Sequence, residues 1–315
     1  MNHYCNISDI RDLSKWLETG RKWAADPDGQ ASLGKGKTLC LLFFNNSLRT
    51  RLSTQKAAQM LGMETIVMNF GSEGWSLEFG DGVVMDGGKA EHIIEAAGVV
   101  GQYADMIGIR AFAGLQDRES DRAENVLQGF VRHAGVPVLN MESATAHPLQ
   151  ALADALTIDQ HRTAKRPKVV LSWAPHPRAL PQAVPNSFVQ MMQRMPVDLV
   201  VTHPKGYELD PELSGAYEPQ YDQAQALEGA DFVYVKNWSS VADYGAVLNQ
   251  DPAWMMTREK LGGARFMHCL PVRRNVVVED AVLDHTPTLI LQQAANRTLA
   301  ARLALAHMLN DKALK

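Results

Sequence analysis

The fold of this chain is decided by one stretch of sequence, Leu39-Cys40-Leu41-Leu42-Phe43-Phe44-Asn45-Asn46-Ser47-Leu48-Arg49-Thr50-Arg51. Residues 39–44 form an unbroken apolar run, which is typical of a strand buried on both faces. The following residues, 52–61, have the composition of a helix. A strand that runs through a short polar turn into a helix is the repeating unit of parallel α/β sheets, so this stretch predicts such a sheet.

The turn between the predicted strand and helix collects two hydroxyl and two guanidinium groups, on Ser47, Thr50, Arg49 and Arg51. A helix N-terminus offers free backbone N–H groups and the positive end of the helix dipole, which together favour an anion. Arginine adds bidentate recognition of phosphate oxygens. The turn therefore predicts a phosphate-bearing ligand, although a capped helix with solvated arginines would have the same sequence.

Short apolar runs alternate with helix-like segments along the whole chain. Runs of this length, separated by helices, predict parallel strands covered on both faces. Two successive sets of them predict an α/β fold of two doubly wound parallel-sheet domains joined by helices. The runs are Leu39–Phe44, Thr65–Phe70, Asp105–Arg110 and Val136–Met141 in the first half, and Lys168–Trp173, Val197–Thr202, Asp231–Val235, Arg265–Leu270 and Thr288–Leu291 in the second.

A length of 315 residues suits two domains of ordinary size. We expect the first domain to comprise residues 1–147 with a C-terminal helix over 296–315, and the second to comprise residues 148–295. A helix over residues 149–159 is expected to bridge them. A further helix, Ile10–Ala25, is predicted near the N-terminus with Ser8 or Asp9 as its cap.

Composition narrows the class of function. Net charge is −4, from 31 basic and 35 acidic residues, which gives no reason to expect nucleic acid or an acidic membrane as a partner. Cys5, Cys40 and Cys269 form no CxxC pair, which favours a reducing compartment and argues against zinc. Without a signal-peptide pattern or an 18-residue apolar stretch, the chain is expected to be cytoplasmic. The sequence contains neither a GxxxxGK[ST] motif nor a strand-GxGxxG-helix arrangement, so ATP and dinucleotides are not favoured as ligands.

Cationic and hydrogen-bonding side chains recur where the predicted strands end, which is where ligands bind in open α/β sheets. Their mutual repulsion would cost stability unless an anion fills the space between them. Single members also have ordinary interpretations: His203 as a loop residue, Cys269 as a packed small hydrophobe, and Trp173 and Trp238 as residues that pack against the opposite domain. The strand-end residues are Ser47, Arg49, Thr50, Trp75, Arg110, Glu142, His147, Gln150, Trp173, His176, His203, Lys236, Trp238, His268, Cys269, Arg273 and Arg297.

Three motifs resemble those of the ornithine transcarbamylase superfamily in order and spacing. They are Ser47-Leu48-Arg49-Thr50-Arg51, His147-Pro148-Leu149-Gln150 and His268-Cys269-Leu270-Pro271, and the resemblance spans essentially the whole chain. Aspartate transcarbamylases lack the HCLP form. The SMG loop of ordinary ornithine transcarbamylases is replaced here by the proline-rich segment Trp173–Ser187, and HCLP is followed by Val272-Arg273-Arg274-Asn275. Both departures resemble the branch that carbamoylates N-succinylornithine or N-acetylornithine.

This resemblance implies transfer of the carbamoyl group of carbamoyl phosphate to the side-chain amine of an N-acylated ornithine, in arginine biosynthesis. It also implies a trefoil knot in the second domain, in which a later segment threads the proline-rich loop, although knots are rare. Homotrimers with active sites shared between subunits are implied as well. Neither a metal nor a cofactor is expected, because phosphate is a good leaving group once its charge is neutralised.

The resemblance also assigns residues. His147, Arg110, Cys269 and Arg297 would be catalytic, with His147 polarising the carbamoyl carbonyl. The acylornithine would lie between the domains against Glu142, His176, Lys236 and Arg273. Lys236 and Arg273 would form ion pairs with its carboxylates. Glu142 could instead cap a helix and Lys236 could extend its amine into solvent. Carbamoyl phosphate would be bound by Ser47, Leu48, Arg49, Thr50, Trp75 of a neighbouring subunit, Arg110, His147, Gln150, Cys269, Leu270 and Arg297.

The acyl group is predicted from Ala90, in Met85-Asp86-Gly87-Gly88-Lys89-Ala90-Glu91-His92. In the family, acetyl enzymes tend to carry glutamate at this position and succinyl enzymes proline. A glutamate would repel the extra succinyl carboxylate, whereas alanine leaves room for it. N-succinylornithine is therefore favoured over N-acetylornithine.

Three rival interpretations stay open. Plain ornithine transcarbamylase predicts activity on free ornithine, and the missing SMG loop counts against it. A catalytically silent anion-binding module would have lost its chemical residues, whereas His147, Gln150, Cys269 and Arg297 are all present. A nucleotide-binding regulator would need a glycine-rich phosphate loop.

Overall fold

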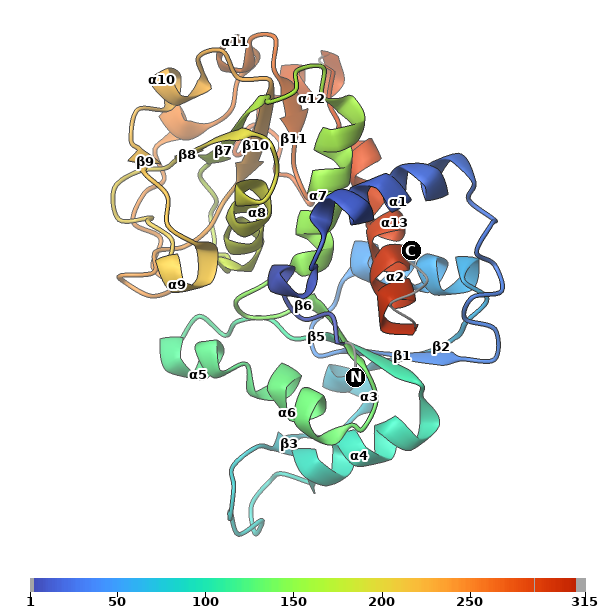
Figure 1. The fold of residues 1–315 in the computed structure, drawn as a ribbon. Coiled ribbons are helices and arrows are strands. Elements are labelled where there is room, and N and C mark those ends of the chain that lie inside the picture. The colour runs from blue at the N-terminus through green and yellow to red at the C-terminus, as the bar shows by residue number, and fades with distance from the viewer. Residues whose placement is uncertain (1–2, 286, 310–315) are drawn as a thin grey trace. The chain divides into compact units, whose positions relative to one another are not determined.

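The computed structural model describes residues 3–285 and 287–309, which form two compact units (Figure 1). Unit 1 consists of the described residues of Met1–Gly114, Glu119–Leu149 and Arg297–Lys315, and unit 2 of Leu115–Arg118 and Gln150–Asn296. The short segment Leu115–Arg118 packs with unit 2, where Arg118 Nη2 donates to Asp210 Oδ2 at 2.7 Å. None of the helices in the described residues is long and apolar enough to cross a membrane.

Unit 1 is built on a parallel sheet of four strands in the order β2-β1-β5-β6. They are β1 (Thr38–Phe43), β2 (Glu64–Asn69), β5 (Met106–Arg110) and β6 (Val138–Glu142). From β1 the chain moves outward to β2 on one side and to β5 and β6 on the other. The sheet therefore has a topological switch point between β1 and β5, which is the position where open α/β sheets bind ligands. A separate parallel pair joins β3 (Leu77–Glu78) and β4 (Glu91–His92).

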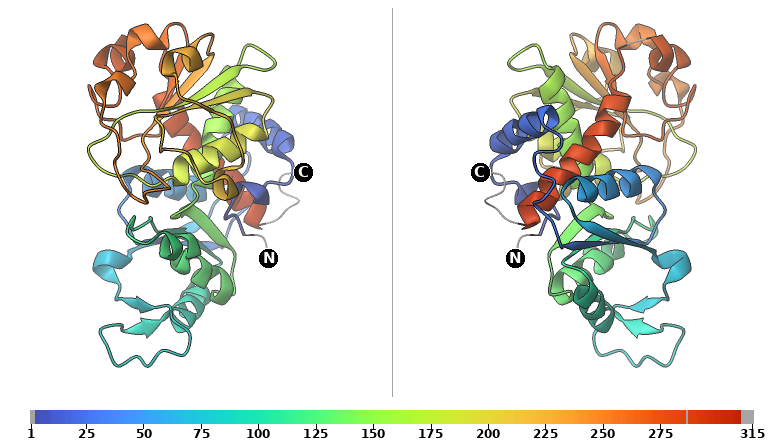
Figure 2. Two further views of the ribbon diagram at one scale, coloured as in Figure 1. Left: turned by 90° about the vertical axis from the view of Figure 1, so that its left-hand side faces the viewer. Right: turned by 90° about the vertical axis from the view of Figure 1, so that its right-hand side faces the viewer.

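Helices cover the sheet of unit 1, and its apolar core includes Cys40, Leu42, Ile107, Ile109 and Phe130. The second part of α13 packs in this unit beside α1, with the rings of Trp16 and His307 5.3 Å apart (Figure 2). The helices are η1 (Ile7–Asp9), α1 (Leu13–Ala25), α2 (Leu48–Met60), α3 (Phe70–Glu73), α4 (Ile93–Tyr103), α5 (Arg118–Ala123), α6 (Asn125–His133) and the part of α13 (Ile290–Leu309) from Arg297 onward.

Unit 2 has a parallel sheet of five strands in the order β11-β10-β7-β8-β9. The strands are β7 (Lys168–Trp173), β8 (Asp198–Thr202), β9 (Pro219–Gln220), β10 (Phe232–Lys236) and β11 (Arg265–Met267). The chain again moves to both sides of its first strand, so the switch point lies between β7 and β10. The loop after Trp173 and the residues after Lys236 both leave the sheet there.

In unit 2, α7 (Pro148–His161) lies beside the first part of α13 (Figure 1), and Asn296 Nδ2 donates to Thr157 Oγ1 at 2.9 Å. Each helix has residues in both units: α7 passes from unit 1 to unit 2 after Leu149, and α13 passes from unit 2 to unit 1 after Asn296. The other helices of unit 2 are α8 (Ala183–Gln193), α9 (Pro211–Ser214), α10 (Gln223–Leu227), η2 (Pro252–Trp254), α11 (Arg258–Leu261) and α12 (Asp280–His285).

The predicted two-domain α/β fold with parallel sheets is confirmed. One predicted strand is wrong: Thr288 makes only an isolated bridge to Phe266, and α13 begins at Ile290. A four-residue apolar run cannot by itself distinguish a strand from the start of a buried helix. The N-terminal helix begins later than predicted and is capped by Asp12, whose side chain accepts from Lys15 N. The last predicted helical residues, 310–315, lie outside the described residues.

Candidate active site

The turn after β1 is arranged as a helix N-terminus. Ser47 is the N-cap of α2, and its Oγ accepts a hydrogen bond from Thr50 N at 3.3 Å. Leu48 and Arg49 begin the helix, so their backbone N–H groups have no carbonyl one turn earlier to bond with. Thr50 is 1% exposed, whereas Leu48 is 70% exposed. The turn therefore presents N–H donors outward on a buried base, as an anion site requires.

Arg110, at the end of β5, is buried and fixed by three oxygen acceptors. Its Nη1 donates to the carbonyls of Asn45 and Asn46 at 2.8 and 2.9 Å, and its Nη2 donates to Glu142 Oε2 at 3.2 Å. Its guanidinium also lies 3.9 Å above the centre of the Phe112 ring. Burial lowers the pKa of Arg110, and the neighbouring Glu142 carboxylate opposes that shift. The carboxylate is thus the counter-ion of this buried cation.

Glu142 ends β6, and the parallel pairing of β5 with β6 sets it opposite Arg110. Its Oε2 also lies 3.4 Å from His147 Nε2. The sequence interpretation assigned Glu142 to the acylornithine and did not identify it as the partner of Arg110. The signal was available, because both residues end strands that the pattern places in one sheet. What was missing was the order of the strands.

Arg297, on α13, contacts both the turn that begins α2 and His147. Its Nη2 donates to Thr50 Oγ1 at 2.7 Å, and its Nη1 lies 3.5 Å from His147 Nε2. His147 Nε2 therefore lies between a guanidinium and the Glu142 carboxylate, and its protonation state decides which of the two it bonds. The described structure brings together Thr50, Arg110, His147 and Arg297, which the sequence predicted from segments up to 247 residues apart. Arg110 and Arg297 thus place two buried guanidinium groups beside the turn that begins α2, where positive charge suits an anion.

Trp75 precedes β3 and Ala90 directly precedes β4 in unit 1. The short β3–β4 pair is drawn in cyan near the lower end of both views in Figure 2. Trp75 is 60% exposed and its Nε1 donates to Glu91 Oε2 at 2.8 Å. Ala90 N donates to Ser76 O at 3.0 Å, and Ala90 is exposed. Both contacts are local to the β3–β4 pair.

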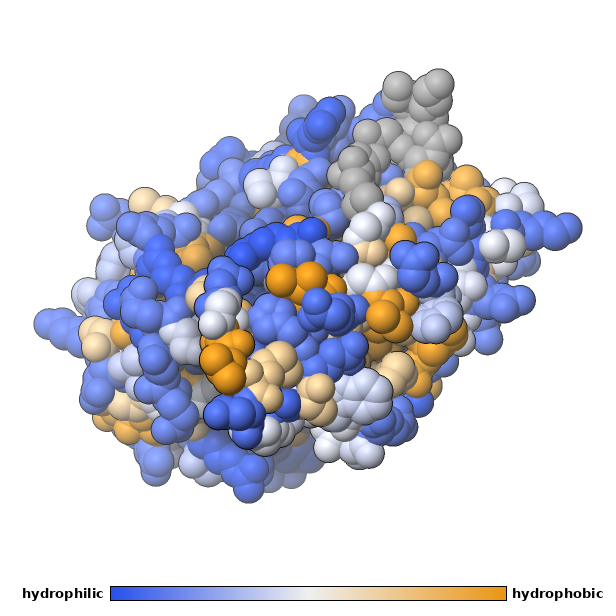
Figure 3. Space-filling view, turned by 90° about the horizontal axis from the view of Figure 1, so that it is seen from below, coloured by the Kyte–Doolittle hydropathy of each residue, from blue (hydrophilic) through white to orange (hydrophobic). Residues whose placement is uncertain are grey.

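The loop between β3 and β4 carries exposed hydrophobic residues, with Val83, Val84 and Met85 exposed by 48%, 78% and 40%. From below, the surface shows small hydrophobic groups scattered among hydrophilic ones (Figure 3). Exposed apolar side chains on a projecting loop are costly in water unless a partner covers them.

In unit 2, the loop after β7 holds His176 against Arg273. The Nε–H of Arg273 donates to His176 Nε2 at 2.9 Å, and His176 Nδ1 lies 2.8 Å from the carbonyl oxygen of Arg178. Arg178 N also lies 3.1 Å from His176 Nδ1, so the tautomer of the imidazole decides which of its contacts are accepted and which are donated. Burial is the largest cause that lowers the pKa of His176, and the charge of Arg273 adds to it.

Lys236 ends β10 and is half-buried, and the residues after it are tied to the loop after β7. Ala174 N donates to Lys236 O at 3.2 Å, and Asn237 Nδ2 donates to Ala174 O at 2.7 Å. Trp173 Nε1 donates to Trp238 O at 2.9 Å. Both tryptophans are fully buried.

The HCLP segment follows β11 and turns sharply. Leu270 N donates to His268 Nδ1 at 2.8 Å, Leu270 has φ 58°, and the Leu270–Pro271 peptide bond is cis. Cys269 and Leu270 are half-buried. Gln150, in the first turn of α7 and 1% exposed, donates through Nε2 to Asp154 Oδ1 at 2.7 Å. Sequence reasoning missed Asp154, a polar residue on the buried face of a helix.

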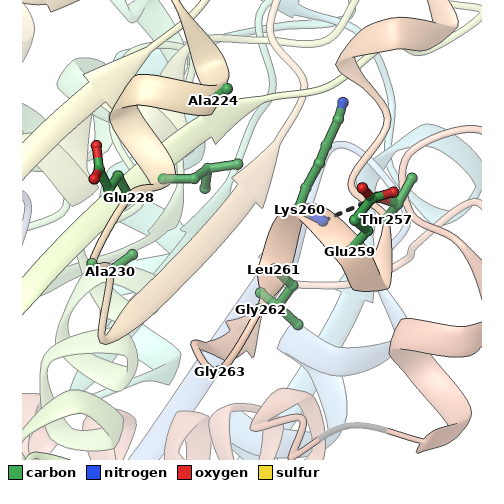
Figure 4. A pocket seen from close by; sticks show the side chains of 11 residues that line it. Ala224, Glu228, Ala230, Thr257, Glu259, Lys260, Leu261, Gly262 and Gly263 are labelled. Atoms are coloured by element: carbon green, nitrogen blue, oxygen red, sulfur yellow. Dashed lines mark hydrogen bonds between the residues drawn. The ribbon is translucent and has the colours of Figure 1, made fainter.

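Two cavities are lined by other residues. One of about 670 Å³ in unit 2 is lined by α10, α11 and the glycines beside them (Figure 4). Its Lys260 amine is held by Gln223 Oε1 at 2.8 Å, Met255 O at 3.0 Å and Ala253 O. The other, of about 230 Å³ in unit 1, is bordered by Phe79, Phe112 and Glu124. Neither is lined by a predicted site residue. Over residues 3–285 and 287–309, no group of three or more His, Cys, Asp or Glu side chains is arranged to hold a metal.

Comparison with known proteins identifies the family. A model described as aspartate/ornithine carbamoyltransferase, carbamoyl-P binding domain, matches residues 2–160. A second, described as aspartate/ornithine carbamoyltransferase, Asp/Orn binding domain, matches residues 181–308. The chain belongs to the aspartate/ornithine carbamoyltransferase family. The resemblance inferred from the three sequence motifs is thereby confirmed.

Individual members of the family are similar over nearly the whole chain. An N-succinylornithine carbamoyltransferase of Bacteroides fragilis (strain 638R) is 46% identical and covers 99% of both chains. An N-acetylornithine carbamoyltransferase of Xanthomonas axonopodis pv. citri (strain 306) is 38% identical over 84% of this chain and 83% of its own. A crystal structure of an N-acetyl-L-ornithine transcarbamylase mutant, with alanine in place of a glutamate, has a TM-score of 0.88 and 35% identity over 98% of this chain and 100% of its own. That mutant is complexed with carbamyl phosphate and N-succinyl-L-norvaline.

Proposed function

We propose that the protein transfers the carbamoyl group of carbamoyl phosphate to the side-chain amine of N-succinyl-L-ornithine, giving N-succinyl-L-citrulline and phosphate in arginine biosynthesis. The observation that carries the proposal is the buried cluster of Arg110, Arg297 and His147 beside the N-terminus of α2. The 46% identity to an N-succinylornithine carbamoyltransferase over 99% of both chains supports it.

In this proposal unit 1 is the carbamoyl phosphate-binding domain. The N–H groups at the start of α2, with Ser47 and Thr50, bind the phosphate oxygens, and Arg49, Arg110 and Arg297 neutralise its charge. The uncharged amine nitrogen of the acceptor forms a bond to the carbamoyl carbon, and the bond from that carbon to the phosphate oxygen breaks. The phosphate leaves with the electron pair and takes up the proton that the amine nitrogen loses. Positioning and preorganised donors together supply on the order of 10 kcal/mol of barrier lowering.

His147 would polarise the carbamoyl carbonyl as negative charge develops on its oxygen. The Glu142 carboxylate, 3.4 Å from His147 Nε2, is placed to stabilise a proton on that nitrogen. In the ligand-free protein Glu142 therefore contacts His147, the residue that would face the carbamoyl group. Its expected contact with the acylornithine is a second role. Gln150 would accept from the carbamoyl NH2 group.

Unit 2 is the acylornithine-binding domain in this proposal. Arg273 and Lys236 would bind the carboxylates of the acceptor, and Cys269 and Leu270 would contribute from the HCLP turn. His176 contacts Arg273 at its Nε, which leaves both Nη groups of Arg273 able to form a bidentate pair with a carboxylate. Acylation removes the charge of the α-amine, so no carboxylate partner is needed for it.

We propose that Ala90 occupies the position of the glutamate that is replaced by alanine in the mutant N-acetyl-L-ornithine transcarbamylase. That mutant, with alanine, is complexed with a succinylated ligand. A side chain without negative charge at Ala90 would admit the second carboxylate of the succinyl group. N-acetylornithine is the second candidate substrate, because N-acetylornithine carbamoyltransferases are 38% identical to this chain.

The test is formation of the citrulline product from carbamoyl phosphate with succinylated, acetylated and free ornithine in parallel. The expected order of kcat/KM is succinylated, then acetylated, then free ornithine. Ala90→Glu is expected to reverse the first two. Ala90→Gln adds the same bulk without charge, so it serves as the control and should reverse them much less. Equal or better turnover of the acetylated substrate by the unmodified protein would overturn the choice of acyl group.

A trefoil knot in unit 2 stays part of the proposal. Its support is local: Leu180 O, in the proline-rich loop, accepts from Ser239 N at 2.9 Å, and Gln182 Nε2 donates to Ser239 O at 2.7 Å. A homotrimer with shared active sites is proposed as well. Exposed Trp75 and the apolar loop at Val83–Met85 fit a role across a subunit boundary. Light scattering coupled to gel filtration would measure the mass, and a monomer would contradict the proposal.

A further inference from the structure

Asp154 is a fully buried carboxylate on α7 that the proposed mechanism does not use. It is 0% exposed, and its Oδ1 accepts from two side-chain amides. One is Gln150 Nε2 at 2.7 Å, and the other is Gln293 Nε2, on α13, at 2.6 Å. Burying a carboxylate is costly unless its hydrogen bonds are well made. These two short bonds are the kind that offsets such a cost.

Gln293 carries the hydrogen bonding onward to the HCLP turn. It is 1% exposed, and its Oε1 accepts from His268 N at 3.0 Å. His268 Nδ1 in turn accepts from Leu270 N at 2.8 Å. An unbroken path of hydrogen bonds therefore runs within unit 2 from Gln150 through Asp154 and Gln293 to residues 268–270.

The chemistry of a carboxylate sets the direction of each bond along this path. A carboxylate can only accept, so both glutamines must turn their NH2 groups toward Asp154. Each amide carbonyl is then directed away from it. For Gln293 that carbonyl receives the N–H of His268, which fixes the backbone just before Cys269. For Gln150 it is likewise the NH2 group that is directed toward Asp154 and the carbonyl that is directed away from it.

We propose that Asp154 is a positioning residue that fixes the amide orientation of Gln150 and, through Gln293, the backbone of the HCLP turn. The role rests on the proposed function, in which Gln150 accepts from the carbamoyl NH2 group. A reversed Gln150 amide would place its NH2 group against the NH2 group of carbamoyl phosphate. The carbamoyl carbon would then no longer be aligned with the attacking amine. A misplacement of this kind costs about 100-fold in rate.

The test variant is Asp154→Asn, which keeps the size of the side chain but can present either an oxygen or an NH2 group to Gln150. It is expected to lower kcat by about 10–100-fold, with a much smaller change in the KM for the acylornithine. Gln150→Met should lower kcat as well. The double variant should be no slower than the slower single variant, because both changes remove the same orientation.

Thr157→Val is the matched control. Thr157 is also fully buried on α7, one turn further along, and it bonds Asn296 on α13 at 2.9 Å without touching either motif. Its loss should destabilise the same pair of helices and leave kcat close to that of the unmodified protein. If Thr157→Val lowers kcat as much as Asp154→Asn, the effect is one of helix packing and the positioning role is overturned.

Hydrogen exchange in the ligand-free protein gives a readout independent of activity. The N–H groups of residues 268–270 are expected to exchange faster in Asp154→Asn and in Gln293→Met than in the unmodified protein, and to be unchanged in Thr157→Val. Unchanged exchange together with unchanged kcat in Asp154→Asn would overturn the positioning role alone. Failure of the unmodified protein to use any of the three ornithines would overturn the proposed function, while faster exchange would still support the hydrogen-bond path.

Discussion

Replacing Glu142 by glutamine is the sharpest test of the cationic cluster in unit 1. Glu142 is the carboxylate 3.2 Å from Arg110 Nη2, and the two side chains are 11% and 5% exposed. At an effective dielectric constant of about 20, that separation corresponds to an attraction of about 5 kcal/mol. Glutamine keeps a neutral acceptor, and Arg110 keeps the carbonyls of Asn45 and Asn46. The net loss of unfolding free energy is therefore expected to be about 3 kcal/mol, at the low end for breaking a buried pair.

The assay is thermal and urea unfolding with and without inorganic phosphate. A loss of about 3 kcal/mol corresponds to a fall in Tm of roughly 6–12 °C for a domain of this size. Phosphate supplies the missing negative charge, so it should bind the variant more tightly than it binds the unmodified protein. Tenfold tighter binding would restore about 1.4 kcal/mol at saturation.

Asp284→Asn is the control, because it breaks a pair with Arg274 whose side chains are 50% and 46% exposed. Exposed pairs contribute about 0–1 kcal/mol, and this one has no reason to depend on phosphate. The reasoning is refuted if Glu142→Gln is as stable as the unmodified protein. It is also refuted if phosphate stabilises both proteins equally.

Further outcomes are expected elsewhere in the chain. Arg297→Lys should lower kcat by about 10–1000-fold, because a single ammonium cannot reach Thr50 and His147 together; wild-type kcat would contradict this. Burial lowers the pKa of His203 below 6.5, so the unfolded chain takes up the proton first and the unfolding free energy falls as pH drops below 6.5. When the unfolding free energy is measured against pH, the His203→Asn variant should show a smaller fall below pH 6.5 than the unmodified protein. Gly101→Val should destabilise unit 1, because a Cβ there would lie 1.9 Å from Ala134 O, and unchanged urea unfolding would show that the helices can separate at little cost.

Much of the fold could be predicted because short apolar runs and helical segments alternate along this chain. Eight of the nine predicted runs coincide with strands to within a few residues, and the ninth, Thr288–Leu291, became the start of α13. Its few apolar residues fit a helix as well as a strand, and only packing beside α7 distinguishes them. Strand order was not available from the pattern, since any parallel order has the same local sequence.

The sequence by itself determined which residues are candidates for anion binding, because Ser47, Arg49 and Thr50 are adjacent at a strand-to-helix turn and need no distant contact to act together. Only the tertiary structure decided that Arg110 pairs with Glu142 and that Arg297 reaches Thr50, since those contacts depend on which strands are neighbours and on where α13 packs. The same holds for Asp154. A polar residue on a buried helix face gives no sign of its partners, and hydrogen-bond partners 139 residues apart, such as Gln293, are chosen by folding rather than by spacing.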